Sequence, residues 1–389
     1  MEKTNVSTIL RKYTMIIALI LVVIFFSITT QGKILFPQNI NNLISQNAYV
    51  FVLATGMLLC ILTGGNIDLS VGSVVCFAGA IGAVMMDKGV NMWAAVLTML
   101  IIGLLIGVWQ GFWIAYVKVP PFIATLAGMY AFRGLSNVVL QGLTVSIKSE
   151  AFIRVFGGGA DCYVPDLFGG ENFNMTCMIA GCIAVVILVA MQLKSRINNK
   201  SRGYETAPLG STLVKLAVIG AVILWVSYKL SSYKGIPTAL IWILLVLLIY
   251  GYTTTKTRMG RYLYAVGGNE KATRLSGINT KKVYFFAYVN MGLLAALAGI
   301  LTIARLTSSQ PTYGQGYEMD AIGACFIGGA SAYGGVGTVP GVVIGAVLMG
   351  VINQGMSIMG IDANYQKVVK GLVLLAAVTF DVLSKREKK

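Results

Sequence analysis

The amino-acid sequence predicts an all-α protein, a polytopic bundle of transmembrane helices. Three observations predict this class: 57% of the 389 residues are hydrophobic, only 11% are charged, and the charges gather between long apolar stretches. A soluble domain carries about 25% charged residues, which cover its water-facing surface. The composition therefore excludes a soluble enzyme, a disordered chain and a disulfide scaffold.

Apolar stretches of roughly 20 residues are long enough to cross a bilayer as helices. The chain holds twelve candidates, and together they predict one transmembrane domain over residues 1–389. Two of them, 70–86 and 319–334, are short and interrupted by glycine, so each is either a full span or a re-entrant or interrupted helix. The candidates are residues 14–30, 44–63, 70–86, 92–117, 122–141, 174–193, 210–230, 237–254, 284–304, 319–334, 340–359 and 366–383.

The basic residues predict the orientation of these spans. With the N-terminus (Lys3, Arg11 and Lys12) in the cytoplasm and sides alternating through twelve spans, nearly all of the net charge of +16 lies on the cytoplasmic side. This agrees with the positive-inside rule and places both termini in the cytoplasm. Topology and attraction to membrane lipids therefore explain the positive charge, and no nucleic-acid partner is predicted.

The side chains that support most enzyme chemistry are absent from the sequence. There is no histidine, the six cysteines form no C-x-x-C pair, and no G-x-x-x-x-G-K-[ST] phosphate loop occurs. Charges in or at the ends of the predicted spans are few, namely Asp68, Arg133, Lys370 and Asp381. Lys370 and Arg133 are expected to extend toward an interface. We therefore predict no catalytic residue, no metal site and no cofactor, and few of the buried acids typical of ion-coupled carriers.

A glycine-interrupted stretch, Thr63–Ser73, is the first of four that carry more specific information. Gly64 and Gly65 end the preceding helix, and Asp68 or Ser70 can cap the next one. Polar interruptions at membrane depth occur where the backbone is buried in protein or lines a wet cavity. This stretch is thus either a tight surface loop or part of a pathway.

A short capped helix is predicted in the most basic loop, within Arg261–Ile278. Asn269 suits the N-cap, Glu270 the first turn, and Gly277 the C′ position. A helix of about two turns is too short to be stable alone. It is expected either to lie on lipid headgroups or to dock a cytoplasmic partner.

The other two stretches predict turns and close helix packing. Pro120 and Pro121 end one span and begin the next. Small residues recur at four-residue spacing in the glycine-rich region from Gly316 to Gly350 and at Gly103, Gly107 and Gly111, which allows helices to approach closely.

In this order, the stretches resemble the permease subunits of bacterial ATP-binding-cassette importers for monosaccharides, the ribose, xylose and galactose group. Residues 194–255, with two extra spans, look more like the xylose and multiple-monosaccharide permeases than the shorter ribose permeases. The matching motifs are Gly65-Asn66-Ile67-Asp68-Leu69-Ser70-Val71-Gly72, Pro121-Phe122-Ile123-Ala124-Thr125-Leu126, Gly260-Arg261, Gly267-Gly268-Asn269-Glu270, Arg274-Leu275-Ser276-Gly277, Glu318-Met319-Asp320 and Gly328-Gly329-Ala330-Ser331.

The resemblance implies a homodimer in the cell (plasma or inner) membrane that moves a monosaccharide into the cytoplasm. A separate cytoplasmic ATPase would bind the ATP, and an extracytoplasmic sugar-binding protein would deliver the sugar. Residues 255–283 would form the loop that couples to the ATPase, through Gly267, Gly268, Asn269, Glu270, Ala272, Arg274, Leu275, Ser276 and Gly277. Candidate pathway residues are Asn66, Asp68, Ser70, Phe122, Thr125, Asp320 and Ser331. The alternative interpretation is an ion-coupled secondary sugar carrier.

Overall fold

The computed structural model describes residues 6–158, 161–170, 173–204 and 208–386. Its helices group into two compact units. The larger unit comprises Met1–Ile34, Leu43–Cys162 and Ala239–Lys389, and the smaller one Leu35–Asn42 and Tyr163–Thr238. Helix α10 belongs almost entirely to the larger unit, and the two-span insertion over residues 194–255 stays a prediction.

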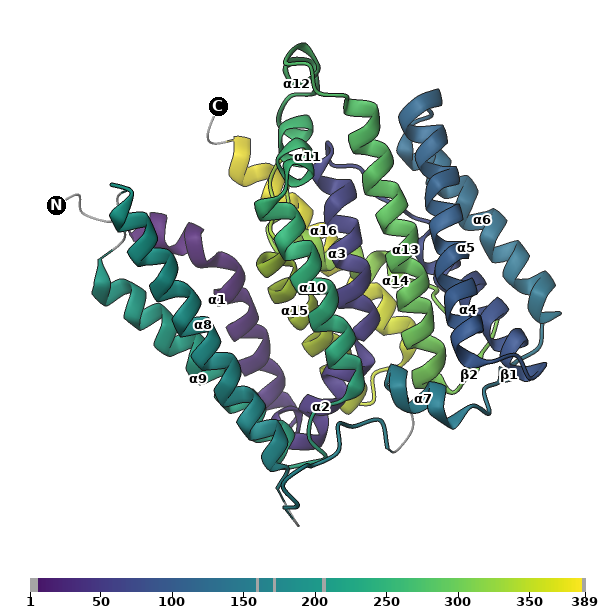
Figure 1. Cartoon of the computed structure of the whole chain (residues 1–389), viewed down its shortest axis with the longest axis horizontal. Coiled ribbons are helices and arrows are strands. Elements are labelled where there is room, and N and C mark those ends of the chain that lie inside the picture. Colours follow the sequence, from purple (N-terminus) through teal and green to yellow (C-terminus); the bar gives the residue numbers. More distant parts are fainter. Residues whose placement is uncertain (1–5, 159–160, 171–172, 205–207, 387–389) are drawn as a thin grey trace. The chain divides into compact units, whose positions relative to one another are not determined.

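The larger unit is almost wholly helical (Figure 1). Two-residue strands β1 (Val145–Ser146) and β2 (Ser308–Ser309) pair antiparallel, and a π-helical turn, Trp113–Val117, extends α5. Helix α2 (Pro37–Gln46) crosses the division between the units. The other helices are α1 (Val6–Thr29), α3 (Ala48–Leu62), α4 (Val71–Asp87), α5 (Met92–Phe112), α6 (Pro121–Leu140), α7 (Glu150–Phe156), α10 (Thr238–Lys256), α11 (Arg258–Gly268), α12 (Glu270–Leu275), α13 (Thr280–Leu306), α14 (Tyr317–Ile327), α15 (Val339–Ile358) and α16 (Ala363–Arg386).

Helix α13 is the central helix of this unit and packs against α3, α4 and α5. Its contact with α5 depends on glycine. A Cβ atom added to Gly103 would lie 2.5 Å from the carbonyl oxygen of Gly292, and one added to Gly107 would lie 2.7 Å from that of Tyr288. The predicted close approach of small residues on α5 is therefore confirmed.

In the described part of the chain, seven helices are long and apolar enough to cross a membrane, and an eighth is counted if α2 and α3, bent by 43°, form one span. The seven are α5 with its π-helical turn, α6, α8 (Met175–Ser201), α9 (Leu209–Ser231), α10, α13 and α15. The predicted total of twelve is not reached by this measure. Among the described residues, the apolar parts of α1 (Thr14–Thr29) and α4 (Val71–Asp87) are shorter than 18 residues, and α14 and α16 are not among the seven. Helix α14 has 11 residues and ends at Ile327, well before the predicted boundary at 334.

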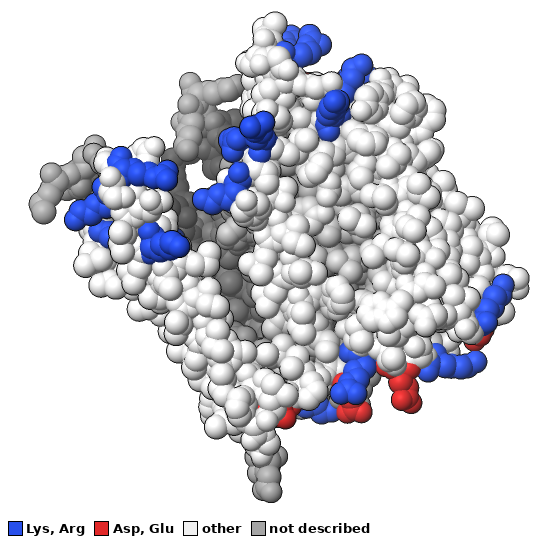
Figure 2. Space-filling model, in the orientation of Figure 1, with Lys and Arg blue, Asp and Glu red and all other residues white. Residues whose placement is uncertain are grey.

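The two ends of the larger unit differ in charge. The start of α1, the short helix α12 and the end of α16 lie at one end, and α7 and the two strands lie at the other (Figure 1). In the view of Figure 2, Lys and Arg side chains of the described residues of this unit are visible at both ends, whereas acidic side chains are visible only at the end opposite α12. In this view the α12 end is therefore the more basic one, as the predicted orientation requires.

The smaller unit contains α8 (Met175–Ser201) and α9 (Leu209–Ser231), which pack on each other. The loop before α8 is organised by Asp166. Its carboxylate accepts hydrogen bonds from the Thr176 hydroxyl (2.7 Å) and from the backbone N–H groups of Phe168, Gly170, Met175 and Thr176. The Thr176 hydroxyl first, and then these N–H groups, hold the pKa of Asp166 well below its usual range.

Candidate functional site: a short exposed helix above two glycine breaks

Helix α12 begins and ends with the predicted signals. The Asn269 side chain accepts from the N–H of Ala272 (2.9 Å), and Gly277 follows the helix with φ +83°. The helix has six residues, and only Thr273 is buried among them. Leu275 is 87% exposed, and Arg274 and Ser276 are also exposed. The tip of α12 therefore carries an exposed apolar side chain, Leu275, beside the exposed Arg274.

Glu270 points back into the protein. Its carboxylate accepts from the hydroxyl groups of Thr280 (3.1 Å) and Tyr284 (3.0 Å) of α13, and it lies 3.7 Å from the Lys118 ammonium group. The same ammonium group lies 5.3 Å from the centre of the Tyr284 ring. Glu270 therefore ties α12 to the central helix and to the turn between α5 and α6.

Helix α11 is seated directly on the breaks that follow α3 and α14. A Cβ atom added to Gly267 would lie 1.9 Å from the carbonyl oxygen of Leu62 and 2.3 Å from the backbone nitrogen of Gly335, so only glycine fits there. The Tyr264 hydroxyl donates to the carbonyl of Gly337 (2.8 Å). Burial raises the pKa of the Tyr264 phenol, which keeps it a neutral donor.

The break after α3 buries the predicted acid. Asp68 is 1% exposed, and its Oδ1 accepts from both the N–H (2.8 Å) and the hydroxyl (2.6 Å) of Ser70. Gln110 of α5 donates to the Ser70 hydroxyl in turn. Neither predicted cap forms a side-chain capping bond to α4. Ser70 is the N-cap residue, but its hydroxyl is turned toward Asp68, and Asp68 accepts from the N–H of Ser70, which precedes the first helical residue.

A second break, residues 328–338, lies against the first. A Cβ atom on Gly65 would lie 1.9 Å from the carbonyl oxygen of Ala332, and one on Gly334 would lie 2.4 Å from Cα of Gly64. Ser331 is buried, and its hydroxyl accepts from the N–H of Tyr333 (3.1 Å). Asp381 of α16 accepts from the N–H of Ala332 (3.1 Å), so this charge near the α12 end of the bundle holds the second break in place.

Polar contacts of Tyr284 connect α12 to the glycine break that follows α3. The Asn66 side chain interacts with the Tyr284 hydroxyl and its amide also reaches Thr63 Oγ1 (3.2 Å). Glu270, Tyr284, Asn66 and Thr63 thus form a continuous polar path from the exposed helix to the end of α3. Nothing in the sequence pointed to Tyr284 or Gln110, because a single tyrosine or glutamine in an apolar span forms no pattern.

Asp320 lies elsewhere, toward the end with the strands. It is 1% exposed, forms an ion pair with Lys370 of α16 (3.0 Å) and accepts from the Tyr49 hydroxyl (2.6 Å). The expectation that Lys370 extends to an interface is therefore wrong, because the buried carboxylate of Asp320 attracts its ammonium group. Arg133 donates instead to the carbonyls of Pro311 (2.9 Å) and Tyr313 (2.6 Å).

The candidate pathway residues do not all meet in one place. Asp68 and Ser70 share a hydrogen-bonded cluster, and Asn66 lies beside the break that holds Ser331. Thr125 is buried on α6, with its hydroxyl donating to the Pro121 carbonyl (2.9 Å), whereas Phe122 is 54% exposed. Asp320 belongs to the separate ion pair. No metal-binding group of three or more His, Cys, Asp or Glu occurs among the described residues.

These features define a class of protein, a multi-pass helical membrane protein. At its basic end, a short exposed helix is linked by hydrogen bonds and close backbone packing to the glycine breaks that follow α3 and α14. Residues 39–378 match the family model described as branched-chain amino acid transport system / permease component. The chain therefore belongs to this family of permease components, in agreement with the resemblance found in its motifs.

Several curated relatives are similar over most of their length. The xylose transport system permease protein XylH of Escherichia coli K12 is 37% identical over 97% of this chain and 93% of its own. XylH of Haemophilus influenzae is 39% identical over 97% and 98%. The ribose import permease protein RbsC of E. coli K12 is 36% identical over 88% and 85%. The higher coverage in XylH agrees with the predicted likeness to xylose permeases. No solved structure matches the chain significantly.

Proposed function

We propose that this chain is the membrane subunit of an ATP-binding-cassette importer that moves a monosaccharide into the cytoplasm. A separate ATPase supplies the energy, and an extracytoplasmic binding protein supplies the sugar. The single observation that carries the proposal is the exposed helix α12, with Leu275 87% exposed at its tip and Glu270 turned inward. The names of the XylH and RbsC relatives support a pentose-type sugar as the substrate.

The proposed mechanism is alternating access driven from the cytoplasm. Closure of the ATPase on ATP displaces α12. Because Glu270 bonds Tyr284 and Thr280, and Gly267 rests on Leu62 and Gly335, the displacement reaches α13 and both glycine breaks. The ATPase can shift the permease between states only if it binds them with different affinity. The sugar itself therefore needs no tight site in the permease.

The proposed topology has both termini and α12 in the cytoplasm. Helix α14 would enter the membrane only partway, since 11 residues extend about 16 Å and the hydrocarbon core is about 30 Å thick. Two copies of the chain would enclose the sugar pathway between them. Glycine breaks that bury their polar groups support such interrupted helices at membrane depth.

The test is co-purification. The tagged full chain, expressed in a cell that carries the genes adjoining its own, is expected to retain an ATP-binding-cassette ATPase. Arg274→Glu with Leu275→Ala is expected to release the ATPase without loss of membrane insertion. Lys200→Ala, an exposed basic residue of α8 outside residues 255–283, serves as the control and should retain the ATPase. If the double variant retained the ATPase, the proposal that α12 docks the ATPase would be wrong.

One observation favours the alternative, an ion-coupled carrier. The buried Asp320–Lys370 pair is of the kind that proton-coupled carriers use, and Asp320 was not among the buried charges predicted from the sequence. A carrier of this kind would take up sugar into liposomes along a proton or sodium gradient without ATP. An importer subunit would not.

A further inference from the structure

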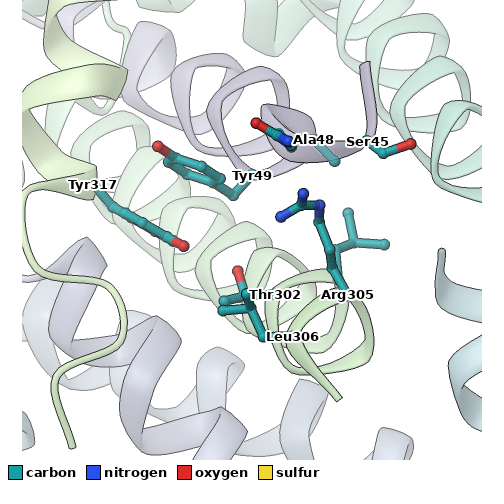
Figure 3. A pocket seen from close by; sticks show the side chains of 9 residues that line it. Ser45, Ala48, Tyr49, Thr302, Arg305, Leu306 and Tyr317 are labelled. Atoms are coloured by element: carbon teal, nitrogen blue, oxygen red, sulfur yellow. The ribbon is translucent and has the colours of Figure 1, made fainter. Parts of the chain in front are cut away.

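A polar pocket lies at the end of the larger unit opposite α12, beyond the groups used in the proposed coupling. It has a cavity volume of about 50 Å³ and lies among α2, α3, α13 and the start of α14 (Figure 3). This is well below the range of pockets for drug-sized ligands, about 300–1,000 Å³, so the pocket suits one compact polar group. Its walls include Ser45, Tyr49, Thr302, Arg305 and Tyr317.

Arg305 is the central feature of this pocket. Figure 3 shows its guanidinium group extending from α13 toward the segment that carries Ala48 and Tyr49. The side chain is only partly exposed. Among the described residues, no hydrogen bond and no ion pair to it is found, although Arg133 and Lys370 are both paired. A partly buried cation without a partner is costly, and a planar guanidinium is suited to bind an oxyanion.

A second group in the pocket also lacks a partner. The hydroxyl oxygen of Ser45 is buried and has no hydrogen-bond partner in the described part of the chain. The carboxylate of Asp320 accepts from the Tyr49 hydroxyl and is paired with Lys370, so its charge is already balanced. The pocket therefore offers a cation and a free hydroxyl, and no acid lines it.

The depth of Arg305 in the membrane indicates which oxyanion is available. Helix α13 has 27 residues and is about 40 Å long, close to the bilayer thickness with its headgroups, and Arg305 is its second-last residue. This places the guanidinium at the level of the lipid phosphates, and the pocket also has the apolar wall residues Leu301 and Leu306. We propose that the Arg305 pocket binds a single phosphate group, from a lipid headgroup or from free phosphate in the extracytoplasmic solution.

The test uses the purified full chain in a detergent micelle without phosphate, with thermal unfolding as the readout. In one arm inorganic phosphate replaces chloride at equal ionic strength. In the other, phosphatidylglycerol is compared with a phosphate-free galactolipid. Wild type is expected to unfold at a higher temperature with phosphate in one arm or both, and the arm that responds identifies the source. Arg305→Gln should weaken the apparent affinity roughly ten-fold or more, because charge-assisted hydrogen bonds are lost.

Two further variants keep the test decisive. Lys148→Gln removes a cation at the same end of the unit, 82% exposed, and should respond as wild type does. Arg305→Lys keeps the charge and should retain part of the response, which guards against a variant that merely folds poorly. An equal response in wild type and Arg305→Gln, or no response of wild type in either arm, overturns the proposal.

Discussion

At the scale of single residues, the proposed function depends on backbone contacts so close that one added Cβ atom would disrupt them. Gly267 and Gly268 are neighbours at the end of α11, yet their surroundings differ completely. A side chain on Gly267 would collide with the backbone of Leu62 and Gly335, whereas nothing lies within 4 Å of the corresponding position on Gly268. Alanine substitutions at these two positions can therefore be compared. Only the substitution at Gly267 disrupts close backbone contacts, whereas both replace a glycine at the end of the same helix.

Gly267→Ala is expected to lower the unfolding temperature of the purified chain and to abolish ATP-driven uptake, because α11 must move away from both glycine breaks. Gly268→Ala should leave both nearly unchanged, since removing a glycine from a helix end costs little. The unfolding temperature and the ATP-driven uptake of the two variants are compared with those of the wild type. Equal behaviour of both variants would contradict the seating of α11 on the two breaks.

Glu270 gives the second prediction at this scale. Glu270→Ala removes the acceptor for Thr280 and Tyr284 and should loosen α12 by about 1–2 kcal/mol, given that hydrogen bonds to a charged group contribute about 1.5–3 kcal/mol and this one is partly exposed. ATPase turnover should continue while sugar uptake falls. Lys200→Ala, an exposed basic residue of α8 outside residues 255–283, is the control and should transport normally. Normal uptake by Glu270→Ala would exclude the Glu270–Tyr284 path.

At the scale of elements, capping residues and glycines predicted the ends of helices better than hydropathy predicted the number of spans. The caps of α12 and the glycine breaks at Gly64 and Gly65 depend on residues that act on the local backbone, so the sequence was sufficient to predict them. The inward position of Glu270 was not predicted, because it depends on Thr280, Tyr284 and Lys118. The length of α14 does not follow from hydropathy, because residues 328–334 are as small and apolar as the helix they end. The Asp320–Lys370 pair joins residues 50 positions apart, and no local pattern indicates it.

The Asp166 loop gives a prediction about pH at this scale. Its carboxylate has a pKa below that of an unfolded aspartate, about 3.9, so its contribution to loop stability is present above that value and is lost only as pH falls through the lower folded pKa. Amide protection of Phe168, Gly170, Met175 and Thr176 in hydrogen exchange, corrected for intrinsic rates, should therefore persist from pH 7 to pH 4. Asp166→Asn should lose it throughout that range. Loss of protection in wild type near pH 4 would show that the carboxylate is not held by these hydrogen bonds.

At the scale of the whole molecule, the charge distribution and the family both support a permease that carries α12 at its basic end. The basic end of the larger unit displays α12, the core carries two glycine breaks in contact with α11, and the chain belongs to a family of permease components. Composition and motifs alone predicted the helical membrane class, the basic face and the family. The pocket at Arg305 and the polar path through Tyr284 could not be predicted, since each joins side chains from helices far apart in the sequence.

The central claim is that transport energy enters from outside the chain through α12. Its most direct measurement is uptake of radiolabelled xylose and ribose into liposomes that contain the full chain with its co-purified ATPase and its binding protein. We predict uptake only when all three proteins and ATP are present, and loss of that uptake with Arg274→Glu and Leu275→Ala in the permease. Uptake by the permease alone, driven by a proton or sodium gradient, would contradict the account.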